Sequence, residues 1–338
     1  MIIAVDAMGG DYAPQEIVAG TVQAVCDFPD VSVILAGPVD RIKQELAKYT
    51  YPKERIFVEA ADDTIEMDEH PVTAVRKQKN ASVVVANRLV KEGRAQAVIS
   101  AGNTGAAMAS SLFVLGRIKG IERPAIAIPL PTMKGASVLL DAGANADCDP
   151  ENLAQFAAMG SIYAEKVLGK KFPRVALLSI GEEETKGNKL TVATHQLLKN
   201  APINFVGNIE GKDIPAGDVD VIVCDGFVGN TVLKFMEGLA TSLFVQIKDV
   251  FLATPLTKLA AAILQPGLRK LSAKLDYSEY GGAILLGIDG ISIISHGRSN
   301  AKAIRNAIRS AKQAVAEGVV ASIPQLLTGP TAKEREEQ

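Results

Sequence analysis

Short apolar runs rich in β-branched residues alternate along the chain with longer segments in which apolar residues recur every three or four positions. The short runs predict strands, and their near-continuous apolarity is typical of strands buried on both faces. The predicted strands are Ile2–Val5, Val31–Leu35, Ile56–Glu59, Ala97–Ser100, Ala125–Ile128, Val138–Asp141, Arg174–Ser179, Asn204–Val206, Asp220–Cys224, Ala283–Leu286 and Ile291–Ile294. The longer segments predict the helices Pro14–Cys26, Ser82–Lys91, Thr104–Leu115, Glu151–Val167, Leu190–Leu198 and Asn230–Val250, the first with Pro14 in its first turn.

This alternation predicts the fold class. It is the sequence form of a three-layer α/β/α sandwich, in which helices cover both faces of a largely parallel, doubly wound sheet. The 338 residues suffice for one large domain or two lobes. Since no linker rich in Pro, Gly or Ser divides the chain, we expect a single domain over residues 1–330 in which any two lobes share one sheet. Residues 331–338 form a charged tail that is expected to fray.

Composition and charge exclude several classes of protein. With 48% hydrophobic and 22% charged residues, the chain is not a disordered or low-complexity protein. A net charge of −2 provides no general attraction to nucleic acid, so no nucleic-acid partner is expected. No stretch reaches the roughly 18 uninterrupted apolar residues of a membrane-spanning helix. Asp6 interrupts the first apolar run, which therefore reads as a strand and not as a signal peptide.

The cysteine and histidine patterns favour neither a metal nor a nucleophilic triad. Cys26, Cys148 and Cys224 are far apart and form no Cys-x-x-Cys pair, which fits a reducing cytoplasm. Cys224 is expected to pack in the core. No acidic or histidine cluster has metal-ligand spacing, so we expect no metal and no cofactor. There is no Gly-x-Ser-x-Gly elbow, and His70 and His195 are expected to be solvated or structural.

Glycine-rich loops follow the predicted strands and are the most informative pattern. Six exits combine glycine with polar residues: Asp6–Asp11, Ser100–Gly105, Asp141–Asn145, Gly181–Asn188, Asp225–Asn230 and His296–Asn300. In an open parallel sheet such exits lie along one edge, where ligands bind. Glycine lets backbone N–H groups approach an anion, and helix N-termini favour negative charge. Although any one of these loops could be an ordinary turn, together they predict a pocket for phosphate or another oxyanion.

These loops match neither common nucleotide motif, because none has the Gly-x-Gly-x-x-Gly or the P-loop spacing. Lys186 lies in a glycine loop from which its ammonium group can bind an anion, or it is an ordinary charged residue of the surface. Asn230 offers an amide donor at a predicted helix N-terminus, or it caps that helix. Asn103 and Thr104 have the same two interpretations. His296 ends a strand and begins a glycine loop, which makes it a candidate ligand contact.

The loops also match, in order, the motifs of a known family. These are DAMGGDYAP (6–14), SAGNTG (100–105), GRIKGIERP (116–124), KGN (186–188), DGFVGN (225–230) and YGG (280–282). The chain resembles the PlsX family, the bacterial phosphate:acyl-(acyl carrier protein) acyltransferases, from residue 1 to about residue 322. It departs from the commonest pattern at Tyr12, where His is frequent, and at Arg298, where Ser is frequent.

The resemblance implies a fold similar to that of the isocitrate and isopropylmalate dehydrogenases. It implies an enzyme that makes acyl phosphate from long-chain acyl carrier protein and inorganic phosphate, for phospholipid synthesis. It also implies a cytoplasmic homodimer associated peripherally with the inner face of the cell membrane. By motif, the catalytic positions fall on Lys186 and Asn230. The candidate substrate or phosphate contacts are Asp6, Gly9, Gly10, Gly102, Asn103, Thr104, Gly105, Asn188, Gly226, Gly229 and His296.

An apolar helical hairpin is expected near residues 244–275. Its candidate membrane contacts share one helix face and are Leu252, Leu256, Leu259 and Ile263. Burial inside the protein or in a dimer is the usual explanation of such a face. The bracketing Pro255 and Pro266 and the cations Lys258, Arg269, Lys270 and Lys274 make attachment to a membrane surface a competing explanation, which the family resemblance favours.

Three other functions compete with acyl transfer from a carrier protein to phosphate. Fold analogy suggests a dehydrogenase of the isopropylmalate type, but the acidic cluster for its divalent cation is not recognisable. Phosphate acetyl transfer to coenzyme A would use the same anion pocket. A non-catalytic membrane scaffold for acyl carrier protein would not need an anion pocket.

In the acyl-transfer mechanism, phosphate attacks the thioester directly, so the enzyme supplies positioning and oxyanion donors instead of a nucleophile.

Overall fold

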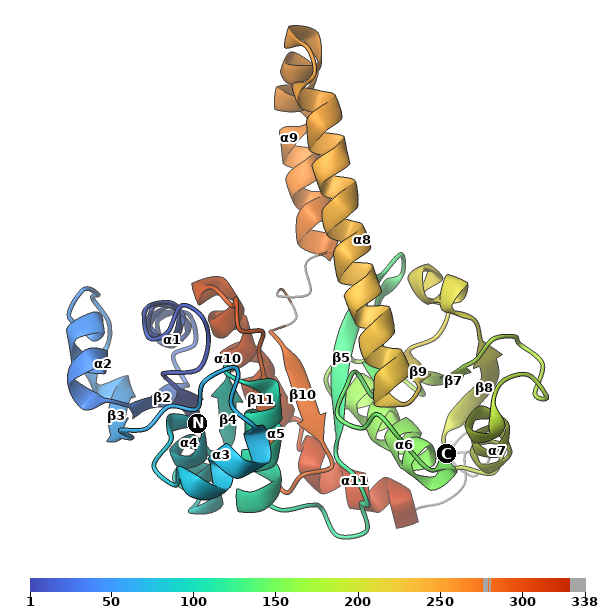
Figure 1. The fold of residues 1–338 in the computed structure, drawn as a ribbon, viewed down its shortest axis with the longest axis horizontal. Coiled ribbons are helices and arrows are strands. Elements are labelled where there is room, and N and C mark those ends of the chain that lie inside the picture. The colour runs from blue at the N-terminus through green and yellow to red at the C-terminus, as the bar shows by residue number, and fades with distance from the viewer. Residues whose placement is uncertain (276–278, 280, 329–338) are drawn as a thin grey trace.

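The computed structural model describes residues 1–275, 279 and 281–328, and these residues fold around one mixed sheet of 11 strands (Figure 1). The strand order is β3-β2-β1-β4-β11-β10-β5-β6-β9-β7-β8. The strands are β1 (Ile2–Asp6), β2 (Ser32–Gly37), β3 (Ile56–Ala60), β4 (Ala97–Ser100), β5 (Ala125–Thr132), β6 (Gly135–Leu140), β7 (Arg174–Leu178), β8 (Asn204–Ile209), β9 (Val221–Val223), β10 (Ala283–Leu286) and β11 (Ile291–Ile294). Every predicted strand is confirmed, with differences of a few residues at the ends.

Strand direction divides the sheet into two parallel blocks. Strands β3, β2, β1, β4 and β11 form one block, and β6, β9, β7 and β8 form the other. Between them, β11 with β10, β10 with β5, and β5 with β6 pair antiparallel, so the second block runs opposite to the first along the ladder. A largely parallel sheet is confirmed. The single parallel edge assumed for all six glycine loops is wrong, because the strand direction reverses between the blocks.

Helices cover both faces of the sheet, which confirms the three-layer architecture (Figure 1). On β1, Ile3 and Val5 pack in one core with α1, α6 and α10, whereas Ala4 packs on the opposite face with α4. The helices are α1 (Gln15–Asp27), α2 (Val39–Leu46), α3 (Pro71–Lys77), α4 (Ser82–Lys91), α5 (Thr104–Val114), α6 (Pro150–Lys166), α7 (Lys189–Leu198), α8 (Gly226–Leu252), α9 (Pro255–Leu275), α10 (Ala301–Ala316) and α11 (Val319–Thr328).

Two predicted helix starts are corrected by the structure. Helix α8 begins at Gly226, four positions before the predicted Asn230, because the Asp225 carboxylate accepts a hydrogen bond from the Val228 N–H at 2.9 Å and caps the helix. Asn230 therefore lies inside the helix and does not cap it. Helix α1 begins at Gln15, so Pro14 occupies the N-cap position and not the first turn.

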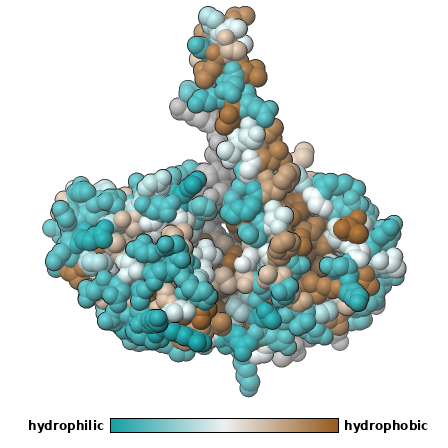
Figure 2. Space-filling view, viewed as in Figure 1, coloured by the Kyte–Doolittle hydropathy of each residue, from teal (hydrophilic) through white to brown (hydrophobic). Residues whose placement is uncertain are grey.

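Helices α8 and α9 form a hairpin that projects from the body of the protein (Figure 1). Figure 2 shows apolar surface along this projection, and Leu252, Leu256, Leu259 and Ile263 are all exposed. Within the described residues, no helix combines the length and apolarity needed to cross a membrane. The predicted cations Arg269, Lys270 and Lys274 have side chains outside the described part of the chain, as does the predicted tail 331–338.

Candidate active site

The loops after β1, β4 and β11 contact one another and form a first group. The Asp11 N–H donates to the Gly297 carbonyl at 2.8 Å. A Cβ at Gly9 would lie 2.7 Å from the Gly102 nitrogen, and one at Gly10 would lie 3.1 Å from the Gly297 oxygen. Gly10 also has a φ of 112°, which favours glycine. These glycines are needed because three backbone segments approach closely at this point.

Asp6 holds this first group from inside. Its buried carboxylate accepts from the Ser100 hydroxyl at 2.7 Å and from the Met8 N–H at 3.2 Å, and burial raises its pKa above the ordinary value. The cavity beside it has a volume of about 10 Å³, which is room for about one water. This geometry favours a positioning role for Asp6 over the direct phosphate contact predicted from the sequence.

The other candidates of the first group lie nearer the surface. Asn103 caps α5 by accepting from the Ala106 N–H at 3.0 Å, and its amide donates to the Met67 carbonyl at 3.0 Å. Thr104 is exposed, and Gly105 lies against Pro71, which a Cβ would approach to 2.6 Å. His296 is exposed, and its Nδ1 accepts from the Arg298 N–H at 3.1 Å. The capping interpretation of Asn103 is therefore confirmed, and its contact with substrate stays a prediction.

Asp141 organises a second group of loops, although it was not among the site residues predicted from the sequence. Its Oδ1 accepts from the N–H groups of Ile126, Gly143 and Ala144 at 3.0, 3.1 and 2.9 Å. Its Oδ2 accepts from the backbone and side-chain nitrogens of Asn145 at 2.7 and 2.9 Å. Burial raises the pKa of this carboxyl, although the N–H donors offset part of that effect.

The start of α8 rests on the loop that Asp141 holds. The Gly226 N–H donates to the Asn145 carbonyl at 2.7 Å. A Cβ at Gly229 would lie 1.9 Å from the Asp141 carbonyl oxygen, so only glycine fits there. A Cβ at Gly143 would lie 3.4 Å from the Asn230 Cβ, which places exposed Asn230 beside this loop. The glycines of the DGFVGN motif thus bring the helix N-terminus against the Asp141 loop.

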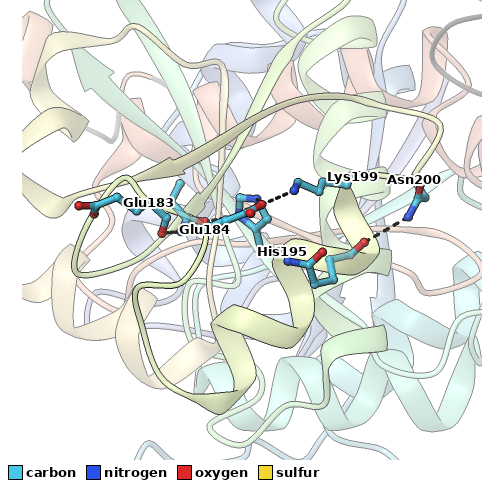
Figure 3. Close-up of polar contacts among 7 residues, drawn as sticks. Glu183, Glu184, His195, Lys199 and Asn200 are labelled. Atoms are coloured by element: carbon cyan, nitrogen blue, oxygen red, sulfur yellow. Dashed lines mark hydrogen bonds and ion pairs between the residues drawn. The ribbon is translucent and has the colours of Figure 1, made fainter.

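The loop that carries Lys186 is anchored from α7 and β8. The Asn208 amide donates to the Glu183 carbonyl at 3.0 Å, and its oxygen faces the His195 Nδ1 at 2.8 Å. Figure 3 shows Glu184 directed toward Lys199 and His195, and the His195 Nε2 lies 3.7 Å from the Glu184 carboxylate. His195 is buried, which confirms its structural interpretation.

Lys186 itself is exposed at the end of this anchored loop. Its carbonyl accepts from the Ser179 hydroxyl at 3.0 Å, and its N–H donates to the Glu183 carbonyl at 3.0 Å. Asn188 caps α7 by accepting from the Thr191 N–H at 2.9 Å. The backbone of Lys186 is thus held by its own loop, while its side chain is exposed to solvent.

A cavity of about 310 Å³ joins the loops after β7 and β9, and we call it the loop cavity. Gly187 and Asn188 line one side, next to Lys186 in the chain, and Asp225 and Val228 line the other side, close to Asn230 in the chain. Among the described residues, no hydrogen bond joins the first loop group to the second, so the convergence of the two groups stays a prediction. A larger cavity of about 720 Å³ lies by Gln96 and Gly290, before β4 and β11, away from the glycine loops.

In the described part of the chain, no three His, Cys, Asp or Glu side chains gather in a metal-binding arrangement. Cys224 is buried, which confirms its core-packing interpretation, and burial raises the pKa of its thiol. The polar side chains that line the loop cavity are those of Ser179, Asn188, Thr191 and Asp225, and Lys186 precedes the lining residue Gly187 in the chain.

Comparison with known proteins identifies relatives along nearly the whole chain. Residues 1–322 match the model of the family described as fatty acid synthesis protein. A phosphate acyltransferase of Desulfitobacterium hafniense (strain DSM 10664 / DCB-2) is 57% identical over 98% of this chain and 99% of its own. A phosphate acyltransferase of Heliobacterium modesticaldum is 54% identical over 97% of this chain and 98% of its own.

Solved structures with a similar fold are more distant in sequence. A phosphotransacetylase from Streptococcus pyogenes aligns with a TM-score of 0.64 and 17% identity, covering 94% of both chains. A 4-hydroxythreonine-4-phosphate dehydrogenase from Klebsiella pneumoniae aligns with a TM-score of 0.53 and 13% identity, covering 93% of this chain and 99% of its own. At these identities the likeness concerns the fold, and it confirms the dehydrogenase-like fold class expected from the sequence.

Proposed function

The chain belongs to the fatty acid synthesis protein family and is an acyltransferase like its curated relatives, and from this premise we propose that it converts long-chain acyl carrier protein and inorganic phosphate to acyl phosphate and free carrier protein. The acyl phosphate would supply phospholipid synthesis. The family assignment favours acyl transfer over the dehydrogenase and scaffold alternatives.

The observation that carries the proposal is the loop cavity, because it brings together the two loops that hold Lys186 and Asn230. A phosphate oxygen attacks the thioester carbonyl, a tetrahedral oxyanion forms, and the C–S bond breaks as the C–O bond is completed. The thiolate that leaves takes up a proton and becomes the free thiol of the carrier. Phosphate is itself the nucleophile, so the protein has to position it and to stabilise the oxyanion.

Lys186 and Asn230 have complementary roles in this mechanism. The Lys186 ammonium holds phosphate or protonates the leaving thiolate, since it extends from a loop whose backbone is fixed by Ser179 and Glu183. The Asn230 carboxamide donates to the oxyanion near the start of α8, where the helix dipole favours negative charge. Gly226 and Gly229 provide close backbone approaches at the start of α8, beside Asn230.

The experiment that tests the reaction supplies the purified enzyme with palmitoyl-loaded acyl carrier protein and labelled phosphate, and measures labelled acyl phosphate together with released carrier thiol. Equal amounts of both products are expected. A parallel reaction with acetyl coenzyme A distinguishes the short-chain alternative. Product formed from acetyl coenzyme A but not from the loaded carrier would overturn the proposed substrate.

We propose a homodimer that forms along α8. Five exposed apolar side chains recur at three- or four-residue spacing along this helix: Phe235, Leu239, Leu243, Ile247 and Val250. At 3.6 residues per turn they share one side of the projecting hairpin, and burial of this stripe against a second copy would remove it from water. Replacement of Leu243 by Glu should shift the sedimentation coefficient from dimer to monomer. A dimer that persists with an unchanged dissociation constant would contradict this interface.

We propose that the tip of the hairpin binds the inner face of the cell membrane. Leu252 ends α8, and the other candidate contacts, Leu256, Leu259 and Ile263, lie on α9. Leu256 is 77% exposed and Ile263 is 73% exposed, so these side chains are available to a lipid surface. Insertion of a few apolar side chains gives reversible, peripheral binding.

A further inference from the structure

The loop cavity has an apolar interior that the mechanism above leaves unused. Its inner wall is formed by Leu153 of α6, Leu178 of β7, Cys224 after β9 and Val228 of α8. The first three of these are buried. The Cys224 thiol is neutral at physiological pH because burial raises its pKa well above the ordinary value. The interior therefore offers contacts to a hydrocarbon and none to a charge.

Several polar groups at the rim are engaged within their own loops. The Ser179 hydroxyl donates to the Lys186 carbonyl, and the Asn188 side-chain oxygen accepts from the Thr191 N–H. The Asp225 carboxylate accepts from the Val228 N–H. A ligand that needed these polar groups as partners would have to displace the hydrogen bonds they already make, which disfavours a strongly polar ligand in this cavity.

The size of the cavity is compatible with a ligand. Ligand pockets in proteins typically have volumes of about 300–1,000 Å³. The loop cavity is open to solvent, and its volume of about 310 Å³ lies at the lower end of that range. At its mouth Ile180 is 81% exposed, so the apolar surface continues outward from the wall.

We propose that the loop cavity binds the methylenes of the acyl chain nearest the thioester, an inference that rests on the proposed function. With the chain in the cavity, the thioester carbonyl lies at the rim, between the loop of Lys186 and the start of α8. Phosphate then approaches from the solvent side. The size of the cavity thereby influences which acyl-chain lengths are accepted, and Val228 is a residue that determines this specificity.

The test is a chain-length profile with acyl carrier protein loaded with even-numbered chains from butyryl to palmitoyl. For the unmodified enzyme, kcat/KM should rise by up to about fourfold per methylene while the cavity fills, and then level off. Val228→Phe fills part of the cavity, and the rise should end at shorter chains. Val228→Ala enlarges the cavity, and the rise should continue to longer chains.

The matched control is Val206→Phe on the exposed side of β8, which should leave the profile unchanged. The ratio of kcat/KM between palmitoyl and butyryl substrates does not depend on the fraction of folded enzyme, and the two Val228 variants are expected to move it in opposite directions. An equal loss of kcat/KM at every chain length would indicate that the cavity binds the pantetheine of the carrier, which all substrates share. That result would overturn the proposal. An unchanged ratio in both variants would also overturn it, while acyl phosphate made by the unmodified enzyme would keep the proposed reaction intact.

Discussion

The hydrogen bonds of Asp141 predict a large effect for the isosteric replacement Asp141→Asn. If the new side-chain oxygen keeps the three donors of Oδ1, the new amide nitrogen faces the two nitrogens of Asn145 that now donate to Oδ2. Two hydrogen bonds to a charged acceptor are lost, at about 1.5–3 kcal/mol each, so the free energy of unfolding should fall by about 3–6 kcal/mol. That is a substantial fraction of the roughly 5–15 kcal/mol that stabilises a typical domain.

Urea unfolding followed by circular dichroism measures this change, with the slope m held to a common value if the variants share it. The control is Asp218→Asn, since Asp218 forms an exposed ion pair with Lys134 and its loss should leave the midpoint nearly unchanged. The Asp141 variant should also lose turnover at temperatures where it remains folded, because the loop beside Asn230 is no longer held. Equal midpoints for Asp141→Asn and the control would refute this account of the second loop group.

Three further predictions follow from single side chains. Leu256→Glu should lower cosedimentation with anionic phospholipid vesicles while acyl phosphate synthesis from the carrier substrate is retained, and undiminished sedimentation would exclude the tip as the membrane contact. Gly229→Ala should destabilise the protein strongly in urea, since the new Cβ would meet the Asp141 carbonyl, and a stable variant would show that α8 can shift. Asp6 has a raised pKa in the folded state, so its protonation stabilises the fold below the ordinary value of 3.8 and this contribution is lost as pH rises through the folded pKa. The unfolding free energy of the unmodified protein relative to Asp6→Asn should therefore fall as pH rises, and a difference that grows with pH would contradict this.

The strands could be predicted from the sequence because each is a short run rich in apolar residues, and most are buried on both faces, whereas the edge strands β3 and β8 are partly exposed. Their directions could not be taken from the same runs. The structure extends β5 to Thr132 and begins β6 at Gly135, so a two-residue turn joins them and forces an antiparallel pair. The predicted ends at Ile128 and Val138 left a longer connection, and the reversal between the two blocks was missed.

The predicted start of α8 was wrong because packing overrides local helix propensity there. Gly226 and Gly229 are poor helix formers, yet they start α8 because the Asp141 loop leaves no room for a side chain. Helix α10 was not predicted, although Asn300 caps it and Ile304 and Ile308 have helical spacing. These two signals were present in the sequence.

The candidate site could be predicted in part. The motifs identified the loops, and the structure joins those of Lys186 and Asn230 at one cavity. The role of Asp141 could not be predicted, because one of its donors is Ile126 on β5, and this contact depends on a pairing of strands that the sequence pattern does not specify.

The most direct test of the central claim compares Lys186→Ala with Lys212→Ala in the formation of labelled acyl phosphate from palmitoyl-loaded carrier protein. Lys212 is an exposed lysine paired with Glu210 outside the loop cavity, and its replacement should leave the rate within about twofold. Removal of one charge-stabilising donor typically costs about 10²–10³ in turnover, and this loss is expected for Lys186→Ala with unchanged circular dichroism. A Lys186→Ala enzyme that forms acyl phosphate as fast as the Lys212 control would contradict the assignment of the reaction to this cavity.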